Sequence, residues 1–253
     1  MGKTEKTVAL SKRLQMLADM VSPGSRVADV GCDHGFLPIY LVQTGKCPGC
    51  LAMDVRNGPL SGAEEHIASF GLGEYIATRL SDGLSAYRQG EAQTLVCSGM
   101  GGRLMERILA EGGEKSRSFS ELILQPQSEI PEFRRFLRKE GFAVIQEEAV
   151  YEEGKFYFAM KAVFRGKEPS GQQETFPETG QETEELYDRY GKQLLSDRHP
   201  VLKQYLISRR QAVEGILEQL RQKDTGKSEA RQRELSREKA CLESALGLFA
   251  EDC

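Results

Sequence analysis

The alternation of short apolar segments with amphipathic ones over residues 26–141 limits the possible folds of this 253-residue chain more than any other feature. Runs rich in Val, Leu, Ile and Ala predict strands, and most are followed by a stretch with helical spacing that ends near a glycine. Strands that alternate with helices of this length form parallel sheets covered by helices on both faces. We expect strands at 26–31, 50–54, 75–80, 94–99 and 121–126, and helices at 36–45, 59–70, 101–112 and 129–141.

The segment that closes this pattern differs from the rest. Residues 143–164 form two apolar runs around a Glu-Gly-Lys turn, which predicts an antiparallel hairpin. An amphipathic helix is expected over 4–20. The predicted fold class is therefore α/β, a mostly parallel sheet with one antiparallel strand, in a domain covering residues 1–164.

The C-terminal third has a different character. Residues 165–181 lack apolar periodicity and are rich in Gly, Pro, Gln and Glu, which predicts a linker. Within 182–253, apolar residues repeat at intervals of three and four along 201–220 and again along 235–249. This pattern predicts an antiparallel α-helical hairpin, a short coiled-coil domain. Either a monomer or a homodimer held by this coiled coil is compatible with the pattern.

Composition excludes several classes of protein. Hydrophobic residues make up 39% and charged residues 28%, so a wholly disordered chain is excluded. We find neither an apolar run long enough to span a membrane nor a secretory signal, and we expect a cytoplasmic protein. The six cysteines are scattered, so reduced thiols are expected. Cys47-x-x-Cys50 is typical of zinc or redox sites, but no second Cys/His pair accompanies it, and we expect no metal.

The distribution of charge is uneven. The formal net charge of −4 disfavours nucleic-acid binding for the chain as a whole. Residues 1–26 nevertheless carry five basic against two acidic side chains, and 186–240 carry 13 against eight. Both ends of the chain can therefore present a positive surface. The alternative interpretation is that these are ordinary solvated helix faces.

The turn after the first predicted strand indicates the kind of ligand. In DVGCDHGFLP (29–38), Asp29 ends the strand, and Gly31 and Gly35 bracket the turn into the helix. A dinucleotide-binding loop would require glycine where Asp33 and Phe36 stand. A carboxylate at Asp33 would repel a pyrophosphate but attract a ligand that carries an ammonium and a sulfonium group. S-adenosylmethionine is such a ligand.

Two further acidic residues follow the next two strands. Asp54 ends the second strand and can accept hydrogen bonds from ribose hydroxyls, and Asp82 follows the third strand, where it can meet an adenine amino group. Gly83 would allow close approach of the ligand. A turn-forming role is the alternative for Asp82. Since the carboxyl ends of parallel strands share one edge of a sheet, these acids predict a cofactor site there.

The order of these segments resembles that of the class I methyltransferases, which have a Rossmann-like sheet and use S-adenosylmethionine. Within that class, a set of motifs resembles the bacterial tRNA (adenine-N1)-methyltransferases that act on the D-arm adenine at tRNA position 22. The resemblance implies a tRNA substrate and a C-terminal coiled-coil domain. The motifs are LSKRL (10–14), VADVGCDHGFLPIYL (27–41), Gly58-Pro59, SGMGG (98–102) and LILQPQ (122–127), while Arg56-Asn57 and the C-terminal segment depart from the family pattern.

Methylation at adenine N1 needs positioning more than base catalysis, because this nitrogen is unprotonated at neutral pH. We expect the loop of Ser98, Gly99 and Met100 to approach the base edge, with Met100 as an apolar contact. Asp33 is expected to accept a hydrogen bond from the adenine amino group or to favour the arriving positive charge. Its alternative roles are to cap the following helix or to bind the cofactor. Gln125 and Gln127 are further candidates for contact with the base, or simply turn residues.

Basic side chains are the expected contacts to RNA phosphates. Two other functions remain open: a methyltransferase acting on a small metabolite, and a non-catalytic cofactor-binding scaffold whose coiled coil recruits a partner. The expected phosphate contacts are Lys12, Arg13, Arg103, Arg107, Arg209 and Arg210.

Overall fold

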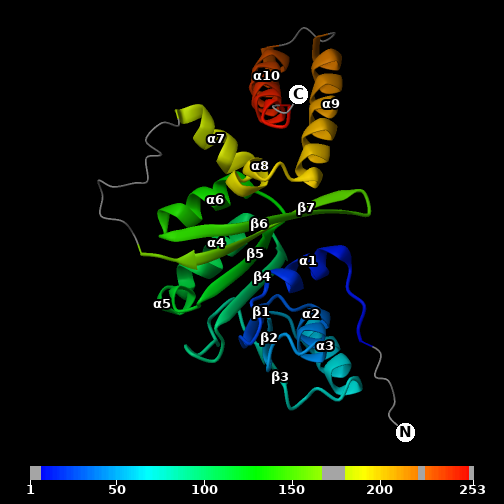
Figure 1. Ribbon diagram of the computed structural model, residues 1–253, viewed down its shortest axis with the longest axis vertical. Coiled ribbons are helices and arrows are strands. Elements are labelled where there is room, and N and C mark those ends of the chain that lie inside the picture. Colours follow the sequence, from blue (N-terminus) through cyan, green and yellow to red (C-terminus); the bar gives the residue numbers. More distant parts are fainter. Residues whose placement is uncertain (1–6, 167–179, 222–225, 251–253) are drawn as a thin grey trace. The chain divides into compact units, whose positions relative to one another are not determined.

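A central sheet organises the first part of the chain in the computed structural model, which describes residues 7–166, 180–221 and 226–250 (Figure 1). Within these residues the sheet has seven strands in the order β3-β2-β1-β4-β5-β7-β6. All neighbouring pairs are parallel except those of β7, which runs antiparallel to both β5 and β6. The predicted α/β class with one antiparallel strand is confirmed. The strands are β1 (Val27–Val30), β2 (Cys50–Asp54), β3 (Ile76–Leu80), β4 (Thr94–Met100), β5 (Glu121–Pro126), β6 (Phe142–Glu152) and β7 (Lys155–Phe164).

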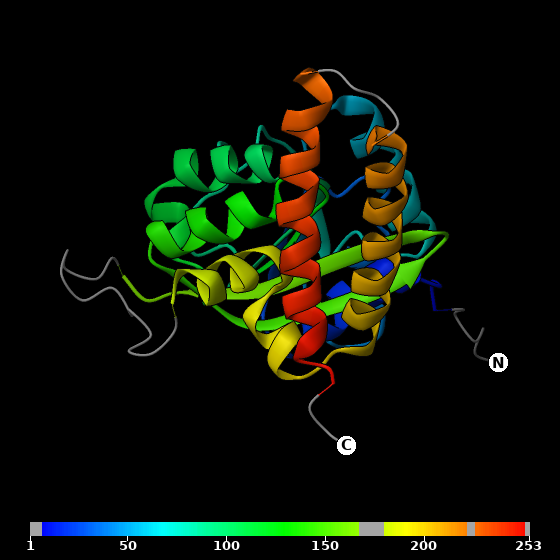
Figure 2. The ribbon, with the colours of Figure 1, turned by 90° about the horizontal axis from the view of Figure 1, so that it is seen from above.

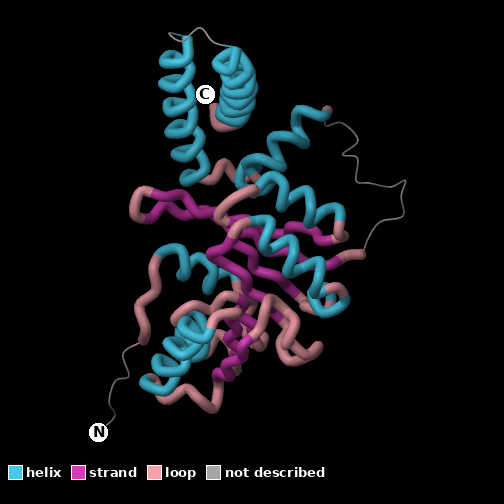
Figure 3. Tube along the Cα trace, turned by 180° about the vertical axis from the view of Figure 1, so that it is seen from behind, coloured by secondary structure: helices cyan, strands magenta, loops and turns pink. Residues whose placement is uncertain are grey.

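Helices cover both faces of this sheet (Figure 3). Successive strand residues point to opposite faces, so Val27 and Ala28 enter two different hydrophobic cores. One core receives buried side chains of α1, α2 and α3, such as Leu17, Leu41 and Ile67, and the other receives those of α4 and α6. The helices of this part are α1 (Lys12–Met20), α2 (Phe36–Gln43), α3 (Asn57–Ser69), α4 (Gly102–Gly112), α5 (Glu114–Arg117) and α6 (Ile130–Lys139).

The strand order determines where a ligand can bind. The chain passes outward from β1 to β3, then returns to the other side of β1 to form β4. The order therefore reverses between β1 and β4, and in open sheets of this kind ligands bind at the carboxyl ends of the strands beside that point.

The first helix starts later than the sequence pattern indicates. It begins at Lys12 instead of residue 4, and Ser11 caps it by accepting a hydrogen bond from the Leu14 N–H through its hydroxyl. Residues 7–11 are not helical, and residues 1–6 lie outside the described part of the chain. The difference has a local cause. The Ser11 hydroxyl favours a helix start at Lys12, and the apolar Val8, which suggested an earlier start, does not outweigh this cap.

The chain divides into two compact units, Met1–Gln173 and Glu174–Cys253. The predicted linker spans this division, and most of it lies outside the described residues. The second unit contains α7 (Gln181–Tyr190), α8 (Lys192–Ser196), α9 (Pro200–Arg221) and α10 (Gly226–Gly247). The last two lie side by side as a hairpin (Figure 2). No helix among the described residues combines the length and apolar character needed to cross a membrane.

Candidate active site

Two buried carboxylates lie where β1 and β2 end. Asp29 is 3% exposed and Asp54 is 5% exposed. No hydrogen-bond donor among the described residues reaches the Asp29 carboxylate, whereas Asp54 accepts the Arg56 N–H at 2.9 Å. Burial raises the pKa of Asp29 to about 7; the Arg13 guanidinium opposes this shift, and the carboxylates of Asp54 and Asp33 add to it. The edge of the sheet therefore holds concentrated negative charge that a cationic ligand would neutralise.

The turn after β1 has the backbone conformation that its glycines permit. Gly31 and Gly35 have φ of +78° and +73°, and the Gly31 N–H donates to the Met53 carbonyl at 2.8 Å. Asp33 also has a positive φ, +48°, a costly conformation for a non-glycine residue. Its side chain is 70% exposed, and a carboxylate oxygen lies 3.8 Å from His34 Nε2. Asp33 is thus held at the surface of the turn, accessible to a ligand.

Residues 98–102, which we call the acceptor loop, begin within β4: Ser98, Gly99 and Met100, expected as a loop, form the irregular end of this strand and lie directly against the turn after β1. A Cβ atom on Gly31 would be 2.9 Å from Met100 Cε, and Met100 Sδ also accepts a contact from Cys97 Sγ at 3.5 Å. The Met100 side chain therefore packs against the turn after β1. Contact with a base is thus not its only role. The turn expected to bind the cofactor and the acceptor loop are therefore in direct contact, through Gly31 and Met100.

The three glycines at residues 99, 101 and 102 lie in different surroundings. A Cβ on Gly101 would lie 2.9 Å from Ser128 Oγ, and one on Gly102 would lie 2.7 Å from the Ser128 carbonyl oxygen. These two glycines allow the loop to pack against the turn after β5. Gly99, with φ +76°, is the open position, and the atom nearest to its Cβ site is Arg13 Nη1 at 3.6 Å. The loop can therefore meet a ligand at Ser98 and Gly99.

Gln125, on the neighbouring strand β5, holds the acceptor loop through hydrogen bonds. This side chain is fully buried, and its Oε1 accepts hydrogen bonds from Arg13 Nη1 and from the Gly99 N–H, both at 3.2 Å. Its Nε2 donates to the Pro126 carbonyl at 3.3 Å. With both ends of the amide engaged, Gln125 holds the loop instead of contacting a base. Gln127, the other glutamine considered for that contact, is exposed.

Arg13 connects the first helix to this loop and to the β6–β7 hairpin. Its guanidinium lies 5.8 Å from the centre of the Tyr157 ring. The backbone N–H groups of Lys12 and Arg13 donate to the Glu152 carboxylate at 2.6 and 3.2 Å. Glu152 could not be found from the sequence, because it lies about 140 residues from the helix it holds and belongs to no motif.

The third acidic residue differs from the first two. Asp82 is exposed and pairs with Arg107 through two hydrogen bonds of 2.8 and 3.1 Å, which lower the pKa of the Asp82 carboxyl. Gly83 packs against α4, since its Cβ site lies 2.9 Å from Ile108 Cγ1. A cofactor contact for Asp82 and a phosphate contact for Arg107 would each have to compete with this ion pair.

The remaining basic candidates fall into two groups. Lys12 is exposed, and Arg103 is 83% exposed with its Nε 3.8 Å from Glu129, so both are accessible. In the helical hairpin, Arg209 Nε lies 2.6 Å from a carboxylate oxygen of Glu238, and Arg210 Nε is buried with no hydrogen-bond partner among the described residues. The structure thus engages Arg209 within its own unit.

The part of the chain that forms the sheet is similar to known methyltransferases. Residues 10–160 match the family model for a methyltransferase domain. A tRNA (adenine(22)-N(1))-methyltransferase from Bacillus subtilis is 39% identical over 153 residues, which are 60% of this chain and 64% of that protein. The match thus spans just under two thirds of this curated relative.

Solved structures match over nearly the whole chain. The crystal structure of the B. subtilis M1A22 tRNA methyltransferase is 30% identical with a TM-score of 0.77, covering 94% of this chain and 98% of that one. A Streptococcus pneumoniae protein, a candidate tRNA (m1A22) methyltransferase solved with S-adenosyl-L-methionine, is 30% identical with a TM-score of 0.79. That match covers 94% of this chain and all of the other.

Proposed function

Because this chain belongs to the methyltransferase-domain family and, within it, to the tRNA (m1A22) methyltransferases, we propose that it transfers a methyl group from S-adenosylmethionine to N1 of adenine 22 in tRNA. The observation that carries the proposal is the pair of buried carboxylates, Asp29 and Asp54, beside a glycine turn that touches Met100 at the end of β4. Since tRNA is the proposed substrate, we place the protein in the cytoplasm.

The residues at the sheet edge fit the proposed methyl donor. Gly31 and Gly35 allow the turn to pack closely, because a Cβ at Gly31 would lie 2.9 Å from Met100 Cε and one at Gly35 would lie 3.1 Å from Ala63 Cβ. The Asp29 carboxylate is buried without a hydrogen-bond donor among the described residues. Because an unpaired buried carboxylate is costly, a cationic ligand at this position would be stabilising. When bound, S-adenosylmethionine supplies a methyl group made electrophilic by its sulfonium.

In this proposal the acidic residues have different roles. Asp54 accepts hydrogen bonds from the ribose hydroxyls, and Asp29 faces the positive end of the donor. Asp33, exposed on its strained turn, accepts a hydrogen bond from the adenine amino group or stabilises the positive charge that methylation creates. Asp82 and Gly83 would contact the donor's adenine only after Arg107 releases Asp82.

The adenine needs no general base, because its N1 lone pair is free at neutral pH. It must instead be unpaired and held in line with the methyl group, and such positioning can lower a barrier by roughly 7–11 kcal/mol in favourable cases. At the open part of the acceptor loop, the Ser98 hydroxyl and the backbone of Ser98 and Gly99 can contact the adenine. Gln125 holds this part of the loop by accepting a hydrogen bond from the Gly99 N–H. Exposed Lys12 and Arg103 are proposed to contact RNA phosphates.

The test is a transfer assay. The full chain is incubated with S-adenosylmethionine labelled on its methyl group and with unmodified tRNA, and the digested nucleosides are identified by mass spectrometry. We expect label in 1-methyladenosine. Label in a small molecule but not in RNA would instead support the small-metabolite alternative, and binding of the donor without any transfer would support the scaffold alternative.

A further inference from the structure

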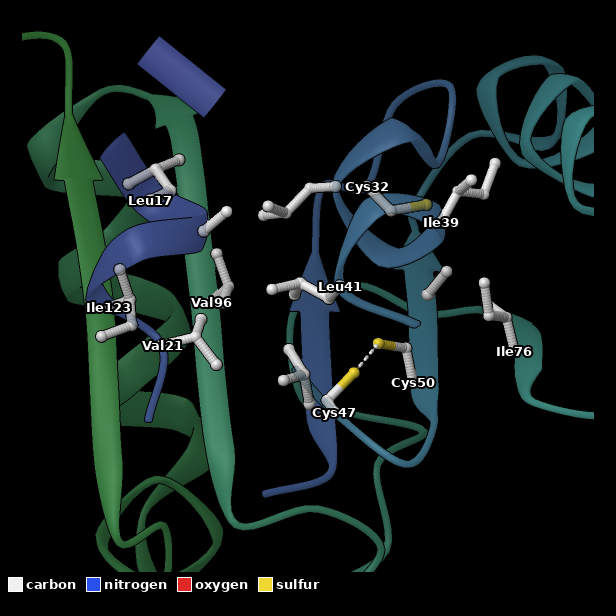
Figure 4. Close-up of a cluster of buried hydrophobic side chains, with 14 of the residues drawn as sticks. Leu17, Val21, Cys32, Ile39, Leu41, Cys47, Cys50, Ile76, Val96 and Ile123 are labelled. Carbon is white, nitrogen blue, oxygen red and sulfur yellow. Dashed lines mark hydrogen bonds between the residues drawn. The ribbon is translucent and has the colours of Figure 1, made fainter. Parts of the chain in front are cut away.

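Two cysteines that the proposed reaction does not use lie together at the opposite edge of the sheet. Cys47 precedes β2, and Cys50 is its first residue, four positions before Asp54 at the other end. Their sulfur atoms are 3.2 Å apart (Figure 4). Both side chains are 2% exposed. The two thiols are therefore already in contact inside the core that covers one face of the sheet.

The surroundings of the two thiols are unequal. The pKa of Cys47 is lowered, mainly by its hydrogen bond with Cys50 and further by the Gly49 backbone and the positive charge of Arg26, while burial opposes the shift. The pKa of Cys50 is raised by the same hydrogen bond and by burial. Such a pair has one sulfur suited to attack as a thiolate and a second that retains its proton.

Cys47 also has a route for a small reagent. It lines a hollow of about 330 Å³ together with Pro48 and the half-exposed Tyr75. Because only 2% of Cys47 is accessible, a reagent that reaches the sulfur must be close to water in size. Hydrogen peroxide meets that condition, whereas peptide disulfides do not.

A metal is a poor explanation for the pair. A structural zinc site needs four ligands, and the described residues contain no group of three or more Cys, His, Asp or Glu that could hold an ion. The contact between the sulfur atoms instead resembles the reduced form of a disulfide. Bond formation requires them to approach by about 1.2 Å, to the usual S–S length of about 2.05 Å.

We propose that Cys47 and Cys50 form a peroxide-oxidisable dithiol that closes to an intramolecular disulfide. In the first step the Cys47 thiolate attacks one oxygen of hydrogen peroxide, which breaks the O–O bond, gives a sulfenic acid on Cys47 and releases hydroxide. In the second step the Cys50 sulfur attacks the Cys47 sulfur, the S–S bond forms, and the hydroxyl leaves with the Cys50 proton as water. The pair loses two electrons, and the peroxide is reduced to hydroxide and water.

The disulfide should leave the methyl-donor site intact. It would tie the turn before β2 to the start of that strand, whereas Asp54 stands at the far end. We therefore expect the affinity for S-adenosylmethionine to change less than twofold on oxidation. Reduction by a dithiol reagent should restore both thiols.

The test maps the oxidation state of each cysteine in the intact protein. The reduced full chain is treated with hydrogen peroxide, quenched, unfolded in acid, alkylated and digested for mass spectrometry. Cys32 and Cys97 are the internal controls, because both are buried and burial raises the pKa of each thiol. We expect the peptide containing residues 47–50 to escape alkylation and to be two hydrogens lighter while both controls remain alkylated.

Two variants separate the steps. In Cys50→Ser, Cys47 should accumulate a sulfenic acid that dimedone traps, and in Cys47→Ser, Cys50 should remain a thiol. The wild-type map does not depend on either variant folding. If residues 47 and 50 stay alkylated, or if Cys97 oxidises as fast as Cys47, the proposal is overturned, with no consequence for the proposed methyl transfer.

Discussion

At the scale of single residues, Asp29 links the stability of the fold to its ligand. Its folded-state pKa of about 7 lies above the ordinary value of 3.8, because burial disfavours the charged form. The folded chain thus holds this proton more tightly than the unfolded chain. The contribution of Asp29 to stability is fully present below about pH 4 and is lost as the pH rises to about 7.

Replacing the carboxyl should reverse that loss. We expect Asp29→Asn to be more stable than the wild type at pH 8 by as much as about 4 kcal/mol, with the difference shrinking as the pH falls from 7 towards 4. Urea unfolding at several pH values measures it. The same variant should bind S-adenosylmethionine at least tenfold more weakly at pH 8. A stability difference that is independent of pH would contradict the account of Asp29.

Gln125 offers a second test, because it acts on the acceptor loop through Arg13 and the Gly99 N–H. Gln125→Leu leaves two donors without an acceptor, a cost of about 1–3 kcal/mol. We expect kcat with tRNA to fall at least tenfold while the Kd for S-adenosylmethionine changes less than twofold. Gln125→Glu keeps an acceptor oxygen and should retain more activity than Leu. Equal loss of donor affinity and kcat would indicate general damage to the fold.

The sequence predicted the site only in part, for reasons visible at individual residues. Asp29 and Asp54 were predictable because they lie at the ends of apolar strands, where a local pattern reveals them. The bonds that Gln125 makes were not, since its partner Arg13 is 112 residues away and only the folded sheet brings them together. Gly101 and Gly102 belong to the motif SGMGG, but the reason for glycine at these positions, the approach of Ser128, depends on tertiary structure.

At the scale of elements, the mostly parallel sheet and its crossover helices followed from alternating patterns, whereas the start of α1 did not. Helix α1 is anchored at its N-terminus by Glu152 of the hairpin, whose carboxylate accepts two backbone N–H groups. Desolvation raises the pKa of this carboxyl, but the hydrogen bonds from Lys12 and Arg13 lower it by more. The stabilisation is thus present at neutral pH and is lost as the pH falls below the ordinary glutamate range.

This anchor can be removed by a substitution at the last residue of β6. We expect Glu152→Ala to cost about 1 kcal/mol at pH 7, the usual cost of losing a cap at a helix start. The adjacent Glu153→Ala serves as the matched control, since that side chain is exposed and no hydrogen bond of it is seen with the described residues. Chemical denaturation of both variants measures the difference. Equal stabilities of the two variants would mean that Glu152 does not hold the helix.

At the scale of the whole molecule, the mildly acidic chain must still attract a polyanion. If accessible Lys12 and Arg103 contact phosphates, the tRNA Kd should rise steeply with salt, because each neutralised phosphate releases counterions. Arg103→Ala should weaken tRNA binding and reduce the slope of log Kd against log salt by about one. Arg88, exposed in the segment that precedes β4 at the opposite edge of the sheet, provides the matched control. A slope unchanged by Arg103→Ala would remove Arg103 from the RNA surface.

The central claim concerns the ligand that the edge between β1 and β2 accepts, and calorimetry tests it most directly. The intact chain is titrated at pH 8 with S-adenosylmethionine and, separately, with NAD, whose pyrophosphate the carboxylates should repel. The account predicts saturable binding of one S-adenosylmethionine, weakened in Asp54→Asn, and no binding of NAD. Tighter binding of NAD, or no saturation with S-adenosylmethionine at millimolar concentration, would contradict it.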